Sequence, residues 1–438
     1  MNKNISVVGL GKLGLCFAAC AASRGFFVAG IDIEKAVVTS VNNGIAPWFE
    51  PELTELIKKH GGKNLRCFTT QSEAIQKSDI TFILVATPSN PDGSFSNRFI
   101  EDALEQLSHS LKKSKKRHHT FVISSTVYPN SCENFITIVE KVSKKKHAKD
   151  FSIFYNPDFV KLGNVIKDFL YPDYVVIGSN TLNPKSELHK FYKEFVKSKP
   201  NVITLNLVSA ELAKILLNCF ITVKISYANL VGNICEKIKG AQTDLITKTL
   251  GSDKRISPFY LKSGLAFGGT CFPRDVRLLT KICKQTNVSD YLVNAVSQIN
   301  ENQNLHLWEK LNKILKQLKN PKIGILGLSF VPNSPVITES PSIFIISRIL
   351  AENVKVHVHD SHALEATRFN FGSNLTYHDE VHDLLKETTI TLLMHNDQQM
   401  KNQIQKFKFN KQHIIIDCWR ILKMKRKNLR IVEIGKNN

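Results

Sequence analysis

The chain has 438 residues, with 59 Lys and Arg against 38 Asp and Glu, and a formal net charge of +21. This length exceeds one ordinary core, so two or three domains are expected. A hydrophobic fraction of 42% excludes a disordered or fibrous chain, and the absence of an evident run of 18 apolar residues predicts no membrane span. The nine cysteines form no Cys-x-x-Cys pair, which favours reduced thiols in the cytoplasm over a disulfide framework.

The N-terminal segment predicts a strand, a glycine turn and a helix. Residues 5–9 form an apolar strand, Gly9-Leu-Gly11-Lys-Leu-Gly14 follows, and a helical pattern continues to Ala22. A second strand covers residues 27–32. Lys12 interrupts the apolar run, so we interpret the segment as this unit rather than as a signal peptide.

Strands and helices alternate along most of the rest of the chain. Further strands are predicted at residues 79–86, 120–125, 322–329, 354–360, 389–394 and 413–417, and long helices at 208–239 and 291–318. This alternation is typical of doubly wound parallel sheets. We therefore predict an α/β fold with two Rossmann-like domains, residues 1–200 and 306–438, joined by a central helical domain of residues 201–305.

The glycine turn and the acid that follows it predict a dinucleotide site. Gly9, Gly11 and Gly14, with Lys12 and Leu13 between them, stand between a strand and a helix, and Asp32 ends the next strand. In this context the turn brings a pyrophosphate to the helix N-terminus. Asp32 would accept hydrogen bonds from ribose hydroxyls and repel a 2′-phosphate, so we expect NAD rather than NADP. The cation at Lys35 leaves that choice open.

A cysteine framed by glycines is the second candidate site. Residues 262–275 are Lys-Ser-Gly-Leu-Ala-Phe-Gly-Gly-Thr-Cys-Phe-Pro-Arg-Asp. Glycines allow backbone and ligand to approach closely, and a neighbouring cation favours the thiolate of Cys271. A buried structural cysteine beside a glycine turn is the alternative that this segment alone leaves open.

Taken together, ordered segments along nearly the whole chain resemble the UDP-glucose/GDP-mannose dehydrogenase family. The matching segments are 32–35, 44–53, 86–88, 125–129, 156–159, 168–178, 211–218, Arg255, 262–275, 324–330 and 339–342. The resemblance implies an NAD-dependent, four-electron oxidation of a nucleotide-sugar primary alcohol to a uronic acid, for polysaccharide precursor synthesis. It favours a UDP-sugar as substrate and a homodimer as the assembly.

The resemblance also assigns roles to individual residues. Cys271 would be the nucleophile that carries the thiohemiacetal and the thioester. Lys214 and Asn218 would stabilise the oxyanions, Asp275 would handle the alcohol proton, and Asp158 would activate the hydrolytic water. Thr87 and Thr126 would line the NAD site. The expected substrate-binding residues are Phe159, Lys161, Arg255, Tyr260, Lys262, Gly264, Phe267 and Gly268.

Several positions depart from the family pattern. Asp158 stands where the family has glutamate, and Leu162 stands where a further glutamate is frequent. Val331, Thr338 and Trp419 stand where the family has cations that hold the nucleotide diphosphate, and Arg420 is a candidate to take the place of one of them. These departures motivate an alternative, a catalytically impaired homologue with a regulatory role. A two-electron dehydrogenase without need of Cys271 is a third possibility.

Two other patterns are weaker signals. Basic clusters occur at residues 112–117, 144–146 and 423–427. They lack interleaved aromatic residues, so we interpret them as solvated faces and expect no nucleic-acid partner. His357-x-His359, followed by Asp360, has no evident third ligand, and we therefore expect no metal site.

Overall fold

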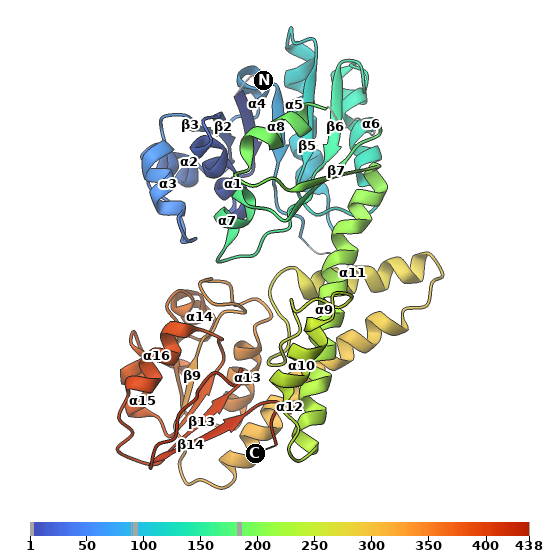
Figure 1. Cartoon of the computed structure of the whole chain (residues 1–438). Helices are drawn as coiled ribbons and strands as arrows, with labels where there is room; N and C mark the ends of the chain where they lie inside the picture. Colours follow the sequence, from blue (N-terminus) through green and yellow to red (C-terminus); the bar gives the residue numbers. More distant parts are fainter. Residues whose placement is uncertain (1–3, 89, 91–94, 182–185, 438) are drawn as a thin grey trace. The chain divides into compact units, whose positions relative to one another are not determined.

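The computed structural model describes residues 4–88, 90, 95–181 and 186–437. The chain forms two compact units, residues 1–216 and 217–438. Each unit contains its own sheet flanked by helices (Figure 1). The predicted α/β fold with parallel sheets and a central helical region is confirmed. The limits of three separate domains stay a prediction.

The sheet of the first unit has the strand order β3-β2-β1-β4-β5-β6-β7-β8. Its neighbouring strands are parallel except for β6 and β7. The strands are β1 (Asn4–Val8), β2 (Phe27–Ile31), β3 (Leu65–Phe68), β4 (Ile80–Ile83), β5 (His119–Ile123), β6 (Phe151–Tyr155), β7 (Tyr174–Gly178) and β8 (Asn201–Leu205). Crossover helices join them: α1 (Lys12–Ser23), α2 (Lys35–Asn42), α3 (Leu53–His60), α4 (Ser72–Lys77), α5 (Arg98–Lys113), α6 (Ser131–Ser143), α7 (Val165–Leu170) and α8 (Glu187–Phe195).

The second unit repeats the Rossmann strand order in a smaller sheet, β11-β10-β9-β12-β13-β14, and all its neighbouring strands are parallel. Its strands are β9 (Ile323–Leu326), β10 (Val356–His359), β11 (Thr376–Tyr377), β12 (Ile390–Leu393), β13 (His413–Asp417) and β14 (Leu429–Glu433). Its helices are α10 (Thr243–Ser252), α11 (Phe272–Gln285), α12 (Tyr291–Leu315), α13 (Pro341–Ala351), α14 (Leu364–Phe371), α15 (Val381–Glu387) and α16 (Gln398–Lys406), with a 3-10 turn, η1, at Gly372–Asn374.

The long central helix, α9 (Leu207–Lys237), begins in the first unit and ends in the second. Of the helices in the described ranges, α9 alone has the length and apolar composition that a membrane span needs, and half of its most apolar stretch is buried. Core helices of globular proteins meet the same criteria. The expected absence of a membrane span therefore stays a prediction.

Aromatic packing supports one face of the first sheet. Phe17 on α1 contacts Phe82 on β4 at 4.7 Å between ring centroids and Phe195 on α8 at 5.0 Å. Phe191 stacks on Phe195 at 5.0 Å. Tilted and offset rings of this kind add about 0.5–1.5 kcal/mol per pair beyond the burial of their area. This core holds α1, and with it the glycine turn, against the sheet.

Close backbone contacts explain two of the three glycines of that turn. Gly9 has a φ of +89°, and a Cβ on Gly14 would lie 1.9 Å from the Gly9 carbonyl oxygen. A Cβ on Gly11 would meet nothing within 4 Å. Gly9 therefore provides the turn, Gly14 lets α1 approach it, and Gly11 leaves open space above the helix N-terminus.

This difference predicts different stabilities for two alanine variants. Gly14→Ala should destabilise the fold by about 1–3 kcal/mol, because the new methyl group forces the turn away from α1. Gly11→Ala should cost less than about 1 kcal/mol, since its methyl group enters open space. Thermal or urea unfolding of both variants measures this, and equal losses would contradict the assigned contact.

Candidate active site

The cofactor residues lie at the carboxyl ends of the first strands. Asp32 follows β2, and its Oδ2 accepts a hydrogen bond from Leu10 N at 2.7 Å while Oδ1 accepts from Glu34 N at 2.9 Å. The carboxylate is thus fixed beside the turn, where dinucleotide ribose hydroxyls bind in such sheets. The buried Thr87 follows β4, and the half-buried Thr126 follows β5. These positions fit NAD.

Lys12 and Lys35 differ in their surroundings. Lys12 opens α1, and burial lowers the pKa of its ammonium group while Glu50 opposes that shift. Glu50 is buried and accepts hydrogen bonds from Gly163 N at 3.1 Å and Val165 N at 2.9 Å. It therefore ties the segment before α3 to the loop before α7. Lys35 opens α2 and is exposed.

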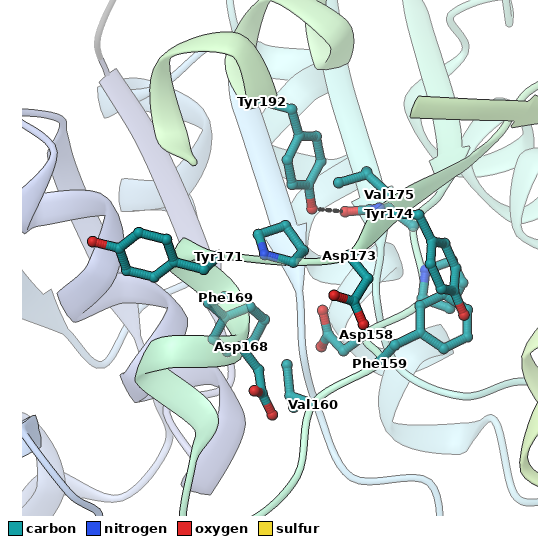
Figure 2. A pocket seen from close by; sticks show the side chains of 13 residues that line it. Asp158, Phe159, Val160, Asp168, Phe169, Tyr171, Asp173, Tyr174, Val175 and Tyr192 are labelled. Carbon is teal, nitrogen blue, oxygen red and sulfur yellow. Dashed lines mark hydrogen bonds between the residues drawn. The ribbon is translucent and has the colours of Figure 1, made fainter. Parts of the chain in front are cut away.

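A cavity of about 140 Å³ lies between the loop after β6 and the α7–β7 connection (Figure 2). Asp158 and Phe159 line it, together with Asp173 from the opposite wall. Burial raises the pKa of Asp158 to about 7, although the nearby Lys214 opposes the shift. A carboxyl group with this pKa is suited to take a proton from water near neutral pH.

Lys214 on α9 is directed at the same loop. Its Nζ donates a hydrogen bond to the carbonyl oxygen of Asp158 and lies 4.9 Å from the centroid of the Phe159 ring. Asn156 supports the loop, since its Nδ2 donates to Val176 O at 2.8 Å and its Oδ1 accepts from the Tyr192 hydroxyl. In Figure 2 the dashed line at the Tyr192 hydroxyl marks this second bond. Lys161 is exposed, and its backbone N–H donates to Asp168 Oδ2 at 2.9 Å.

Glu211 anchors the start of α9. Its side chain is fully buried, and its two oxygens accept hydrogen bonds from Asn130 N at 2.6 Å and Cys132 N at 2.8 Å. These two N–H groups stand at the beginning of α6, where an acidic partner is favourable. Glu211 therefore positions the helix that carries Lys214 three residues later.

In the second unit, Cys271 is exposed at the start of α11, whereas the other eight cysteines, which all lie in described parts of the chain, are buried. Cys271 is the N-cap residue, and its carbonyl oxygen accepts from Asp275 N at 2.8 Å. The positive end of a helix stabilises negative charge on a sulfur. In the same unit, burial raises the pKa of the Cys219 thiol to about 12.

Asp275 and Asn218 form a buried pair within this unit. Asn218 Nδ2 donates to Asp275 Oδ2 at 2.6 Å, and Arg274 Nε lies 3.2 Å from Asp275 Oδ1. The Asp275 carboxylate is fully buried, so both contacts are needed to offset its desolvation. The structure thus brings Asn218, Cys271 and Asp275 to one end of α11.

Neutral amide side chains hold the loop that precedes Cys271. Asn229 accepts from Gly264 N at 2.8 Å and donates to Leu265 O at 3.1 Å, and Gln303 donates to Gly264 O at 2.6 Å. Asn300 accepts from Phe267 N at 2.8 Å and donates to Phe267 O at 3.0 Å. None of these amides was among the site residues predicted from the sequence. Asn300 and Gln303 are three residues apart on α12, which was a signal, but the partners of all three amides are distant in sequence.

Gly264 and Gly268, two of the expected substrate-binding residues, lie in close contact with other parts of the second unit. A Cβ on Gly264 would lie 2.5 Å from the Trp419 ring, and one on Gly268 would lie 2.1 Å from Glu339 O. The Trp419 indole N–H donates to Met394 O at 2.7 Å. Trp419 therefore covers Gly264 and does not supply the charge that the family has at this position.

Arg420 does not take over that charge. Its guanidinium group forms a bidentate pair with Asp244, at 3.1 and 2.9 Å, and donates to Ser263 O at 2.7 Å and to Ile434 O. The residue is 5% exposed. The hypothesis that Arg420 replaces a phosphate-binding cation is therefore wrong on geometry, because its donors already hold the interior of the second unit.

The remaining candidate substrate residues have mixed surroundings. Arg255 is exposed and pairs with Asp253, at 3.0 Å from Nε to Oδ1 and 2.6 Å from Nη2 to Oδ2. Tyr260 has a positive φ of 62° and lies edge-on to Phe272. Partial burial lowers the pKa of Lys262, although Asp244 opposes this shift.

The two strand histidines pair with a third histidine. His357 Nδ1 lies 2.9 Å from His378 Nε2, and His359 Nδ1 lies 2.9 Å from His378 O. Asp360 accepts from Leu328 N and from the loop that follows it. Within the described ranges, no group of three or more His, Cys, Asp or Glu residues is arranged to hold a metal ion.

Comparison with known proteins agrees with this arrangement. Models of the UDP-glucose/GDP-mannose dehydrogenase family match residues 3–196 (NAD binding domain), 208–302 (central domain) and 324–424 (UDP binding domain). The UDP-glucose 6-dehydrogenase TuaD of Bacillus subtilis is 31% identical over 418 residues, which cover 95% of this chain and 88% of that protein. The GDP-mannose 6-dehydrogenase of Pseudomonas savastanoi pv. phaseolicola is 32% identical over 378 residues, or 85% of this chain and 84% of that protein.

A solved structure shows the same likeness in three dimensions. A UDP-glucose dehydrogenase from Pyrobaculum islandicum superimposes with a TM-score of 0.88 at 29% identity, and the match covers 98% of this chain and 97% of that one. This chain belongs to the UDP-glucose/GDP-mannose dehydrogenase family and is an NAD-dependent nucleotide-sugar 6-dehydrogenase.

Proposed function

We propose that this enzyme oxidises the C6 alcohol of a UDP-sugar to a carboxylate through an acyl group carried by Cys271. UDP-glucose is the first candidate, because the match to the UDP binding domain and the name of the Bacillus relative both favour it. The observation that carries the proposal is the exposed Cys271 at the N-terminus of α11. We expect the uronic acid to be made in the cytoplasm as a precursor of surface polysaccharide. A strain that lacks this enzyme but still has uronic acid in its polysaccharide would refute that role.

The proposed reaction consists of two oxidations and a hydrolysis. NAD, held by the Gly9–Gly14 turn and Asp32, would accept a hydride in each oxidation. Asp275 takes part in removing the alcohol proton as the aldehyde forms, and the Cys271 sulfur then adds to the aldehyde carbon. Loss of the second hydride from that carbon turns the thiohemiacetal into a thioester.

Hydrolysis requires a base and a stabilised oxyanion. Asp158 would take a proton from the water that attacks the thioester carbonyl, and the carbon–sulfur bond then breaks to release the carboxylate and the Cys271 thiolate. The Lys214 ammonium and the Asn218 amide would stabilise the negative oxygen of the tetrahedral intermediates. The impaired-homologue alternative is not favoured, since the matched relatives are named as enzymes.

An exposed apolar stripe on α9 supports assembly as a homodimer. Phe220, Tyr227, Leu230 and Ile234 on α9, and Ile238 one residue beyond its end, are each 43–63% exposed in the second unit and recur at spacings of three, four and seven residues. This spacing puts them on one helix face. An apolar face of this kind favours burial against a second copy of the helix.

Replacing the nucleophile should change the reaction stoichiometry. Wild-type enzyme is expected to form two NADH per UDP-sugar consumed, and Cys271→Ala should form one or none, because no thiohemiacetal can supply the second hydride. Absorbance at the NADH band, measured with a panel of UDP- and GDP-sugars, gives the ratio. Cys219→Ala is the matched control. A single NADH that is insensitive to Cys271→Ala would instead establish a two-electron dehydrogenase.

Removal of the base should trap the acyl enzyme. Asp158→Asn should slow thioester hydrolysis by about 100-fold or more, so that an adduct on Cys271 accumulates and is visible by intact-protein mass spectrometry. In the wild-type enzyme hydrolysis should slow as the pH falls below about 7, because the raised pKa leaves Asp158 protonated there. Asp173→Asn serves as the control on the same cavity, and unchanged hydrolysis in Asp158→Asn would remove Asp158 from this role.

Charge on the α9 stripe should separate the protomers. Tyr227→Asp combined with Ile234→Asp should convert the dimer to a monomer in light scattering coupled to gel filtration, because two carboxylates would have to be desolvated at the contact. Lys237→Asp, at the end of the same helix, should leave the dimer intact. A wild-type protein that is monomeric at micromolar concentration would contradict the assignment.

A further inference from the structure

Two basic clusters that are distant in sequence come together in the first unit. The first, residues 112–117, begins in the last turn of α5 and continues into the loop before β5, and the second, residues 144–146, lies between α6 and β6. β5 and β6 are parallel neighbours with His119 opposite Phe151. Lys145 Nζ donates to Lys116 O at 3.3 Å, and His119 N donates to Asp150 O at 3.2 Å. The two loops therefore lie side by side.

Exposed cations dominate this surface, which we call the basic face. Its exposed members are Lys112, Lys113, Lys115, Arg117, Lys141, Lys144, Lys146 and Lys149. Glu140 lies 3.5 Å from the Lys146 ammonium group, and Asp79 pairs with the half-buried Lys116 at 2.5 Å. These carboxylates offset a small part of the charge.

The basic face and the cofactor turn occupy opposite edges of one sheet. The loops of the basic face precede β5 and β6, whereas Gly9, Asp32, Thr87 and Thr126 follow the strands β1, β2, β4 and β5. Because these strands are parallel, their beginnings and ends lie at opposite edges (Figure 1). A large anionic partner on the basic face would therefore leave the cofactor edge open.

Only some of these cations stand where they stabilise the end of a helix. Lys112 and Lys113 end α5, where cations favour the helix dipole by about 0.3–1 kcal/mol each. Lys115, Arg117 and Lys149 lie in the loops beyond the helices and are exposed. Contact with an anionic surface that spans both loops would reduce their mutual repulsion.

We propose that the basic face docks this enzyme on an anionic lipid surface. Neither segment 112–118 nor segment 141–150 contains Phe, Tyr or Trp, so neither offers the aromatic platforms on which single-stranded nucleic acids stack. All but one of the cations are lysines, which act as point charges rather than as forks for individual phosphates. Each contributes about 1 kcal/mol near an anionic leaflet, and salt weakens the attraction.

Vesicle binding by the full-length enzyme tests this proposal. Wild-type protein should co-sediment with phosphatidylcholine vesicles that contain phosphatidylglycerol, should not do so with pure phosphatidylcholine, and should dissociate as salt is raised. A variant with Lys115, Arg117, Lys144 and Lys149 all changed to Glu should bind at least about tenfold more weakly. Its NADH production and thermal unfolding should match wild type, since these side chains are exposed and stand at the edge opposite the cofactor.

A matched control distinguishes the basic face from net charge. A variant with Lys406, Lys408, Lys411 and Lys425 changed to Glu carries the same change in charge on exposed positions of the second unit. It should bind the vesicles like wild type. Equal loss in both variants, no wild-type binding to phosphatidylglycerol, or tighter binding to a single-stranded oligonucleotide than to the vesicles would each overturn the proposal. Because NADH production is measured separately, failure here is distinguishable from failure of the proposed reaction.

Discussion

A carboxylate at the end of the second strand holds the glycine turn in both sheets. Asp32 Oδ2 accepts from Leu10 N at 2.7 Å in the first unit, and Asp360 Oδ2 accepts from Leu328 N at 2.7 Å in the second. Hydrogen bonds from a backbone N–H to a charged oxygen are short and strong. The turn sets where the following helix or loop begins, so the placement of the candidate ligand sites depends on this contact.

The carboxylate that holds the turn has different surroundings in the two units. Asp360 is 4% exposed and also accepts hydrogen bonds from the backbone N–H groups of Ser329, His362 and Ala363. The His395 ring fills the space beside the turn, since a Cβ on Gly327 would lie 2.5 Å from it. Burial opposes its ionisation, but His395 and these backbone N–H groups lower the pKa of Asp360 below its usual range. Asp32 remains partly exposed and keeps an edge for ribose hydroxyls. The first unit is thus the one suited to a dinucleotide.

In the second unit, neutral side chains hold the backbone around the candidate nucleophile in place. Asn229, Asn300 and Gln303 bind the backbone of the loop before Cys271. Trp419 covers Gly264, and Arg420 is held by Asp244. The loop is therefore well supported although the family's cations are absent, and Lys262, at its start, is exposed.

The sequence alone determined the α/β fold, the glycine turn with Asp32, the family and the candidate Cys271, because each depends on local spacing or on an ordered set of motifs. It also placed α9 and α12 to within three residues at their ends. Only the tertiary structure decided which partners the charged groups have: Arg420 with Asp244, Asn218 with Asp275, and Lys214 with the loop at Asp158. These pairs join residues tens or hundreds of positions apart, and their formation depends on burial and on strand order. The same reason explains why two basic clusters that are separate in sequence form one surface, since parallel neighbouring strands bring their preceding loops to the same edge of a sheet.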